Sequence, residues 1–178
     1  MPSKPQTYRD RVARMHVLVV DAFYEFRQVL RGILLDDIGV AFVSDAKTGK
    51  QALAMMQENA FDLVIADTAM QPLGAVELTT MIREGSGGGD PRTPVIAVSG
   101  QPKLADILAA RDAGVDEYLA KPLSAKILQL RIHSIIEHPR PFVCADDFVG
   151  PDRRRHHDGT FAGEDRRHDV ADMAKREA

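Results

Sequence analysis

The sequence has only one cysteine, Cys144, among its 178 residues. A single cysteine cannot form an intramolecular disulfide, and no second cysteine stands at the spacing of a zinc-binding motif. Long apolar stretches are also missing, since no run approaches the roughly 20 residues that a helix needs to span a bilayer. The N-terminus lacks the basic head, apolar core and cleavage site of a signal peptide. We therefore expect a cytoplasmic protein, in a reducing compartment, that is not inserted in a membrane.

A surplus of positive charge is also missing. The chain carries 23 lysines and arginines against 26 acidic residues, for a formal net charge of -3. General binders of polyanions have a basic surface, so broad nucleic-acid binding is excluded as the main function and any nucleotide recognition must be local. The length suits one domain of ordinary size with an appendage.

Short apolar runs alternate with helix-length segments from His16 onward. Residues 1–15 are polar and show no sustained apolar period, so we expect a flexible leader there. Five runs predict strands, at residues 16–20, 40–43, 63–66, 94–98 and 116–119. Residues 24–35 and 124–136 carry apolar stripes at helical spacing, Phe26, Val29, Leu30, Ile33 and Leu34 in the first and Ile127, Leu128, Leu130, Ile132 and Ile135 in the second.

Strict alternation of strands and helices predicts an α/β fold with a doubly wound, five-stranded parallel sheet over residues 16–138. In such sheets, ligands and catalytic groups gather at the carboxyl ends of the strands. The polar residues at these ends are Asp21, Asp67, Ser99 and Lys121, followed by Pro122. We therefore expect these four side chains to lie in one pocket.

The residues around these positions resemble the signature of response-regulator receivers, which have a flavodoxin-like fold. The similar segments are Leu18-Val19-Val20-Asp21, Ile65-Ala66-Asp67, Val98-Ser99 and Tyr118-Leu119-Ala120-Lys121-Pro122, within about residues 16–137. The resemblance implies that Asp67 accepts a phosphoryl group from a histidine kinase and that Ser99 and Lys121 hold the phosphoryl oxygens. It also implies a cis peptide between Lys121 and Pro122.

Residue 22 departs from the receiver pattern. Receivers usually have a second acidic residue here that binds Mg²⁺, whereas this chain has Asp21-Ala22. Mg²⁺ requires oxygen ligands, so a site made of Asp21 and Asp67 alone should bind it weakly. Two interpretations stay open, a hydrogen-bonded structural remnant and residual phosphoryl transfer to Asp67. Tyr118 likewise is either the aromatic switch of active receivers or a residue of the core.

The composition changes after His138, where apolar periodicity stops and arginines, histidines and aspartates become frequent. Residues 139–178 are therefore expected to form an irregular tail, disordered when free. The tail contains an imperfect repeat, because Phe148-Val149-Gly150-Pro151-Asp152-Arg153-Arg154-Arg155 is echoed 13 residues later by Phe161-Ala162-Gly163-Glu164-Asp165-Arg166-Arg167. Each half also contains Arg-x-x-Asp, as Arg155 with Asp158 and Arg166 with Asp169.

The tail has four possible interpretations: a solvated disordered segment, nonspecific nucleic-acid binding, docking on a protein and recognition of a guanine nucleotide. From Pro151 to the end there are seven basic and seven acidic residues, which disfavours nonspecific binding. Arginine can fork onto guanine or phosphate, and aspartate can accept hydrogen bonds from guanine N1 and N2. The predicted nucleotide ligands are Asp152, Arg153, Arg154, Arg155, Asp158, Asp165, Arg166, Arg167 and Asp169.

Arg-x-x-Asp is similar to the inhibitory-site motif by which diguanylate cyclases bind cyclic di-GMP (c-di-GMP). A receiver with a reduced acidic pocket and an arginine-rich extension resembles the CheY-like c-di-GMP effectors of the Cle family. This resemblance implies a non-enzymatic signalling effector, in which the tail binds c-di-GMP and the receiver body engages a protein such as the flagellar motor switch or attachment machinery. No DNA-binding domain follows the receiver, so DNA is not an expected partner. The alternative is a conventional regulator phosphorylated on Asp67.

Overall fold

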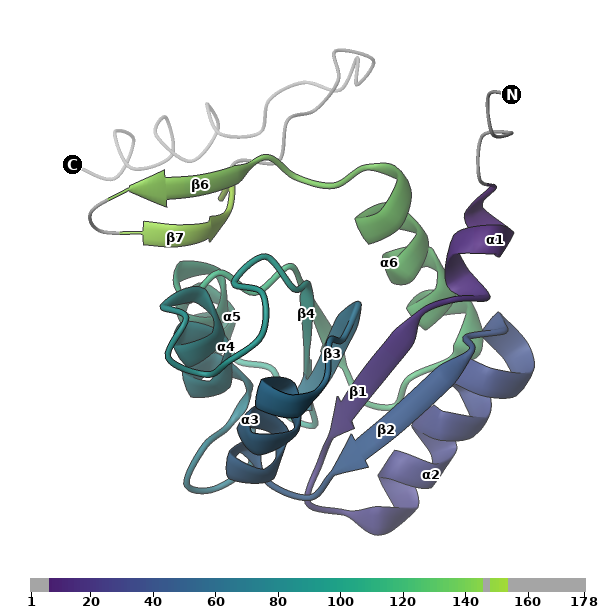
Figure 1. Ribbon diagram of the computed structural model, residues 1–178. Coiled ribbons are helices and arrows are strands. Elements are labelled where there is room, and N and C mark those ends of the chain that lie inside the picture. The colour runs from purple at the N-terminus through teal and green to yellow at the C-terminus, as the bar shows by residue number, and fades with distance from the viewer. Residues whose placement is uncertain (1–6, 146–147, 154–178) are drawn as a thin grey trace, which may run out of the picture.

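The computed structural model describes residues 7–145 and 148–153. Its centre is a parallel sheet of five strands: β1 (His16–Val20), β2 (Phe42–Ala46), β3 (Leu63–Asp67), β4 (Val95–Ser99) and β5 (Glu117–Ala120). The strand order is β2-β1-β3-β4-β5, as Figure 1 shows. The doubly wound, five-stranded sheet predicted from the sequence is therefore confirmed.

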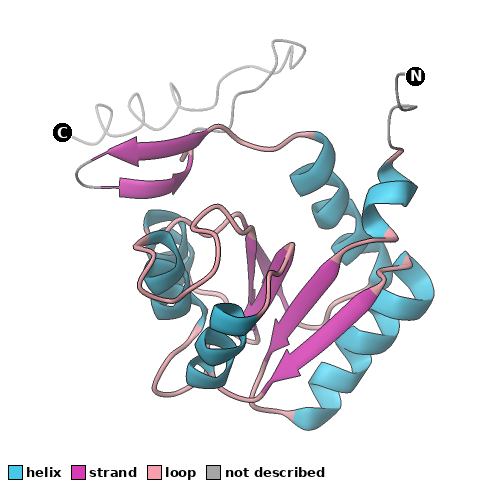
Figure 2. Cartoon of the chain, in the orientation of Figure 1, coloured by secondary structure: helices cyan, strands magenta, loops and turns pink. Residues whose placement is uncertain are grey.

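Helices cover both faces of the sheet (Figures 1 and 2). One face is covered by α2 (Tyr24–Gly32), its continuation η1 (Ile33–Ile38) and α6 (Ala125–Glu137), and the other by α3 (Gly49–Glu58), α4 (Ala75–Arg83) and α5 (Leu104–Asp112). Strand β1 serves both cores, because Val17 and Val19 pack toward α2 and α6 while Leu18 and Val20 pack toward α3 and α4. This burial on both faces explains its uninterrupted apolar sequence.

Strand β2 begins two residues later than the apolar run at 40–43 predicted. The helical segment η1 ends at Ile38 and is capped by Gly39, which has a φ of 86°. The next amide, of Val40, donates a hydrogen bond to the carbonyl of Leu34. Val40 is therefore buried as part of the helix cap, and pairing with β1 starts at Phe42.

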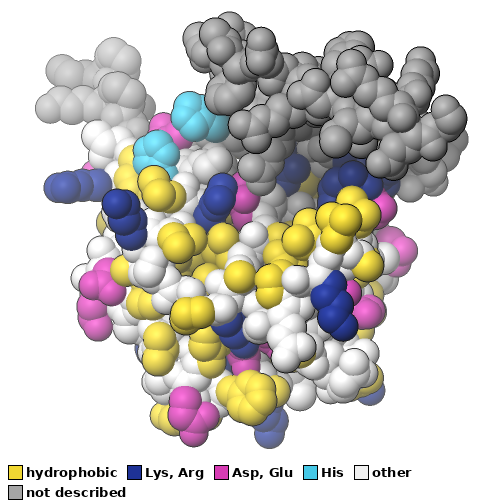
Figure 3. Space-filling model, turned by 180° about the vertical axis from the view of Figure 1, so that it is seen from behind, with side chains coloured by type: hydrophobic (Ala, Val, Ile, Leu, Met, Phe, Trp, Pro, Cys, Tyr) yellow, Lys and Arg dark blue, Asp and Glu magenta, His cyan; other side chains and the backbone are white. Residues whose placement is uncertain are grey.

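Both predicted apolar stripes are only partly buried. In α2 the inward positions are Arg27 and Leu30, and Leu34 continues this face in η1, whereas Val29 is 56% exposed. Exposed large apolar side chains recur along α5 and α6, and Figure 3 shows apolar side chains gathered across the back of the molecule. Those of α5 and α6 are Leu104, Ile107, Leu108, Ile127 and Leu130. No helix among the described residues is long and apolar enough to cross a membrane.

Residues 8–15 differ from the flexible leader that was expected. Helix α1 (Tyr8–Val12) begins with a capping box between Thr7 and Asp10. Its five residues are too few for a stable isolated helix, so packing must support it. Val12 is only 2% exposed, and Arg11 donates a hydrogen bond of 3.1 Å to the Ile136 carbonyl of α6. The ordered domain therefore starts before β1.

The expected irregular tail begins with a folded hairpin. Strands β6 (Phe142–Ala145) and β7 (Phe148–Pro151) pair antiparallel, beyond the amino-terminal ends of the central strands (Figure 1). Local sequence offered little sign of it, because the pairing depends on contacts with the body of the domain. Residues 154–178 of the predicted tail lie outside the described residues.

Candidate functional site

Three of the four predicted side chains, those of Asp21, Asp67 and Lys121, meet where the central strands end. Lys121, just after β5, places its Nζ 2.7 Å from Asp21 Oδ2 and 2.9 Å from Asp67 Oδ1. Asp21 and Asp67 are 1% and 5% exposed. Buried carboxylates need a cation or hydrogen-bond donors to stay charged, and Lys121 supplies both.

Backbone amides complete the shell around the two carboxylates. The amide of Phe23 donates to Asp21 Oδ1 at 2.8 Å, and the amide of Ala69 donates to Asp67 Oδ2 at 3.1 Å. Each of the four carboxylate oxygens therefore has a partner within the protein. Lys121 and two backbone N–H groups therefore supply the hydrogen bonds that the two buried carboxylates need.

The ammonium of Lys121 is held charged. Burial lowers the pKa of Lys121, but hydrogen bonds and charge from Asp21 and Asp67 outweigh that effect and raise the pKa above its ordinary value. The Nζ atom also stands 3.9 Å from the centre of the Phe26 ring, at the distance of a cation–π contact. Lys121 is thus a fixed positive charge across the neutral pH range.

Ser99 ends β4 beside this pair. It is 5% exposed, and its Oγ accepts a hydrogen bond of 3.3 Å from the Gln101 amide. The Ser99 carbonyl accepts from the Lys121 amide at 2.8 Å, which joins the ends of β4 and β5. The Lys121–Pro122 peptide is cis, as the receiver resemblance implies.

Tyr118 lies on β5 with its ring against the core formed with α3 and α4. Its hydroxyl oxygen is buried and has no hydrogen-bond partner among the residues that the structure describes. Core packing accounts for the ring, and the role of an aromatic switch stays a prediction.

Sequence reasoning missed Arg27, which is 8% exposed. Its Nη1 donates to the carbonyl of Asp21 at 2.8 Å and to that of Ala22 at 3.3 Å, while Nε pairs with Asp45 at 2.8 Å. Arg27 therefore fixes the backbone that carries Asp21. Its spacing of three and seven residues from Leu30 and Leu34 places it on the buried face of the helix and could have revealed it.

The residues present fit Mg²⁺ poorly. Magnesium demands a near-octahedral set of oxygen ligands, and Ala22 offers only a methyl group where receivers usually have a carboxylate. Both remaining carboxylates, Asp21 and Asp67, are hydrogen-bonded to Lys121. No group of three or more potential metal ligands occurs within residues 7–145 and 148–153.

Replacing Lys121 with alanine should make stability depend strongly on pH. Without the ammonium, the two buried carboxylates face each other without a cation, and their mutual repulsion destabilises the folded state when both are ionised. Protonation at lower pH removes this repulsion, so the stability that is lost at high pH returns as the pH falls. We expect Lys121→Ala to be less stable than wild type at about pH 8 and to recover much of the difference near pH 5.

Urea unfolding at the two pH values measures this difference in free energy. Lys126→Ala is the matched control, because Lys126 is exposed on α6. A loss in Lys121→Ala that is the same at both pH values would contradict the charge argument.

Only two of the predicted nucleotide ligands fall within the described residues. Asp152 donates its amide to the Pro141 carbonyl at 2.8 Å, and its own carbonyl accepts from Arg140. Arg153 lies beside Asp112. The other predicted ligands, Arg154, Arg155, Asp158, Asp165, Arg166, Arg167 and Asp169, lie outside the described residues.

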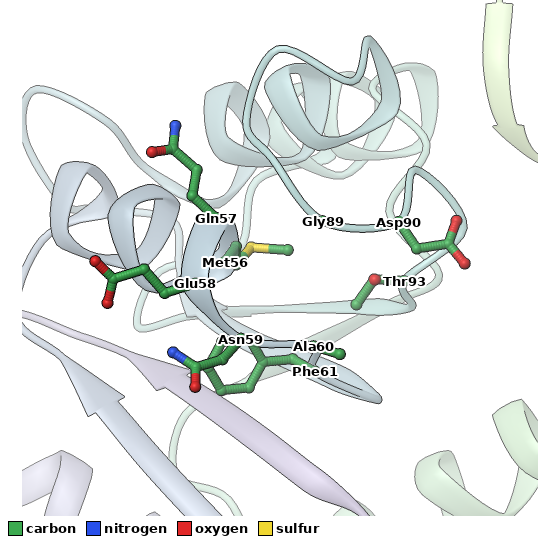
Figure 4. A pocket seen from close by; sticks show the side chains of 9 residues that line it. All are labelled: Met56, Gln57, Glu58, Asn59, Ala60, Phe61, Gly89, Asp90 and Thr93. Atoms are coloured by element: carbon green, nitrogen blue, oxygen red, sulfur yellow. The ribbon is translucent and has the colours of Figure 1, made fainter.

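A separate hollow of about 280 Å³ lies at the far end of the sheet, between the end of α3 and the loop before β4. Glu58 and Asp90 stand on opposite sides of it rather than converging (Figure 4). This arrangement does not assemble charged groups around one point, so the strand-end pocket remains the better candidate for chemistry.

Comparisons with known proteins agree with this geometry. The chemotaxis protein CheY of Pseudomonas aeruginosa is 32% identical over 126 residues, which is 69% of this chain and 97% of that protein. The solved structure of CheY4 of Vibrio cholerae matches with a TM-score of 0.62 and 25% identity, covering 68% of this chain and 98% of that one. A receiver domain of a P. aeruginosa sensor histidine kinase, solved with magnesium in its active-site cleft, matches with a TM-score of 0.61 and 25% identity, over 70% and 98%.

The sequence profile of the response regulator receiver domain matches residues 17–133. These residues include the central sheet from Val17 onward, together with Asp21, Asp67, Ser99 and Lys121. The chain therefore belongs to the response regulator receiver family and contains a signalling domain of the CheY type.

Proposed function

We propose that this protein is a non-enzymatic, cytoplasmic signalling module, a pseudo-receiver whose arginine-rich tail binds c-di-GMP and tunes the affinity for a partner protein. The observation that carries the proposal is the pocket itself. Asp21 and Asp67 share the cation Lys121, and Ala22 stands where a metal ligand would be expected.

Formal charges explain why this pocket suits a receiver without a metal. Two carboxylates and one ammonium sum to a charge of −1, whereas a third carboxylate at residue 22 would bring the sum to −2. A more negative pocket attracts a divalent cation more strongly, and phosphoryl transfer needs cationic neutralisation. The input signal is therefore proposed to enter elsewhere, at the tail.

The tail has the chemistry for a guanine nucleotide with two bases and two phosphates. Arginines can bind phosphate oxygens and guanine O6 and N7, while aspartates accept from guanine N1 and N2. The duplicated motif, centred on Arg153–Arg155 and Arg166–Arg167, supplies these groups twice. This match supports c-di-GMP as the ligand.

A protein partner is proposed for the receiver body, of the kind represented by the flagellar motor switch or attachment machinery. Exposed large apolar side chains on α5 and α6 support a docking role, because exposed apolar surface often marks interaction sites. Nucleotide binding can shift partner affinity only by its different affinity for the two states of the protein. Partner affinity must therefore be measured with and without nucleotide.

Isothermal titration of the full chain with c-di-GMP, GMP and GTP tests the nucleotide. A matched variant replaces Arg154, Arg155, Arg166 and Arg167 with alanine. We expect saturable binding that is selective for c-di-GMP and is lost in the variant. Absence of binding by the wild-type chain would overturn the proposal.

Phosphorylation of Asp67 by a histidine kinase is the second candidate. It is favoured by the retained contact between Lys121 and Asp67 at 2.9 Å, together with Ser99 at the end of β4. Incubation with an acyl phosphate and Mg²⁺, followed by intact-mass measurement, tests this function. A phosphoryl adduct on the wild type that Asp67→Asn abolishes would favour it over the pseudo-receiver.

A further inference from the structure

Residues 148–153, the described part of the first copy of the tail repeat, are folded onto the receiver body. Arg140 makes the main connection, with hydrogen bonds of 3.2 Å to the Val115 carbonyl, 2.5 Å to the Asp116 carbonyl and 3.2 Å to the Asp152 carbonyl. One guanidinium therefore ties the segment before β5 to the end of the hairpin. The hairpin position is set by the receiver and not by the tail alone.

Close packing adds to this connection. The Phe142 ring lies 5.6 Å from each of the Arg83 and Arg92 guanidinium carbons. Gly150 meets Gly114 so closely that a Cβ added at Gly150 would stand 2.9 Å from the Gly114 Cα. The hairpin can dock only because residue 150 has no side chain.

Docking brings an aromatic ring, a guanidinium and a carboxylate together. The Arg153 guanidinium lies over the Phe148 ring at 4.0 Å, and its Nε is 3.8 Å from Asp112 Oδ1 at the end of α5. The side chains of Arg153 and Asp112 are 39% and 48% exposed, so ligands can reach them. Asp112 Oδ1 also accepts from Arg111, whereas Oδ2 has no hydrogen-bond donor within the described residues.

These three groups match the chemistry of guanine. A planar guanidinium supported from below by an aromatic ring offers its other face to a base, and bases stack well on such planes. A carboxylate at the edge accepts from guanine N1–H and N2–H. Adenine lacks both of these donors, so Asp112 would add selectivity for guanine.

We propose that Phe148, Arg153 and Asp112 form one guanine-binding face, so that the receiver body itself completes the nucleotide site. This inference rests on the proposed c-di-GMP function. It assigns Phe148 and Asp112 to the site and places it at the end of the sheet opposite the Lys121 pocket (Figure 1). In this arrangement Arg153 keeps its contact with Asp112 Oδ1, and the base stacks on the face of the Arg153 guanidinium that points away from Phe148.

Titration of the full-length protein with c-di-GMP tests the site through two substitutions. Phe148→Leu removes the ring, and Asp112→Asn removes the carboxylate. Each is expected to weaken binding about tenfold or more, since loss of a stacked or paired base has an effect of this order. Phe42→Leu and Asp106→Asn are matched controls at exposed positions on β2 and α5 and should leave affinity unchanged.

Gly150→Ala provides a second test, because it keeps Phe148, Arg153 and Asp112 while its added Cβ would stand 2.9 Å from the Gly114 Cα and 3.0 Å from the Phe148 ring, which disturbs both docking and the ring. It should weaken binding as much as Asp112→Asn does. Amide hydrogen exchange in β6 and β7 reports whether the hairpin is docked in each variant. Phe148→Tyr keeps the aromatic ring that Phe148→Leu removes, so it should retain the docking and the affinity of the wild type.

The outcomes separate this inference from the function on which it rests. If c-di-GMP binds the wild type, and Phe148→Leu, Asp112→Asn or Gly150→Ala binds with unchanged affinity, the guanine-binding face is wrong while the c-di-GMP function stands. If c-di-GMP does not bind the wild type at all, both are wrong. Selective weakening in the three variants, with unchanged controls, supports the site.

Discussion

Replacing Ala22 with aspartate is expected to give the Asp21–Asp67 pocket a Mg²⁺ site that the wild type has only weakly. The added carboxylate follows Asp21 directly and supplies the oxygen ligand that the methyl group cannot. We expect roughly tenfold or more tighter Mg²⁺ binding, since each carboxylate contributes strongly to a hard-cation site. Titration with MgCl₂, followed by NMR of the amides in the pocket, measures the affinity.

Ala22→Asp should also gain the ability to bind a phosphoryl analogue in the pocket. Beryllofluoride with Mg²⁺ should perturb the Ser99 and Lys121 amides of Ala22→Asp and leave those of the wild type unchanged. Adding Asp67→Asn to Ala22→Asp is the control and should abolish the response. Equal Mg²⁺ affinity in the wild type and Ala22→Asp would show that residue 22 does not limit the site.

Arg83→Ala is expected to have the largest effect on stability. Arg83 is 4% exposed and ends α4. Its guanidinium donates five hydrogen bonds, to the carbonyls of Pro91, Thr93 and Gly114 and to the carboxylate of Asp116. Removing it leaves buried acceptors and a poorly compensated carboxylate, so the free energy of unfolding should fall by about 3–5 kcal/mol.

Charge effects agree with this expectation. Burial raises the pKa of Asp116 against the opposing influence of Arg83 and Arg140, so loss of Arg83 should raise it further. Urea unfolding measures the change in stability. Arg131→Ala is the matched control, because Arg131 is 41% exposed and pairs with Glu117 only at 3.6 Å, so a change below about 1 kcal/mol is expected. An equal loss of unfolding free energy in Arg83→Ala and Arg131→Ala would contradict this role of the buried Arg83 hydrogen bonds.

The sheet and its site were predictable because their signals are local and repeated. Uninterrupted apolar runs indicated β1, β3 and β4, and the polar residue at or just after the carboxyl end of each strand indicated the site. Parallel strands bring their carboxyl ends to one edge of the sheet, so Asp21, Asp67 and Lys121 could be grouped without coordinates.

Elements held by long-range contacts could not be predicted in this way. Helix α1 depends on α6, and the β6–β7 hairpin depends on Arg140 and on the close approach of Gly150 to Gly114. Neither segment has an apolar period that is long enough to indicate an element. Arg27 was missed because a charged residue on a helix is usually solvated, whereas here its hydrogen bonds to the carbonyl oxygens of Asp21 and Ala22 make burial favourable.

The most direct test of the central claim compares the two candidate inputs on one sample of the full-length protein labelled with ¹⁵N. We predict that c-di-GMP shifts the amide resonances around Asp112, Gly114 and the β6–β7 hairpin in a saturable manner. Beryllofluoride with Mg²⁺ should leave those around Asp67 and Ser99 unchanged. Saturable shifts around Asp67 with beryllofluoride, and none with c-di-GMP, would contradict the account and identify a conventional phospho-acceptor receiver.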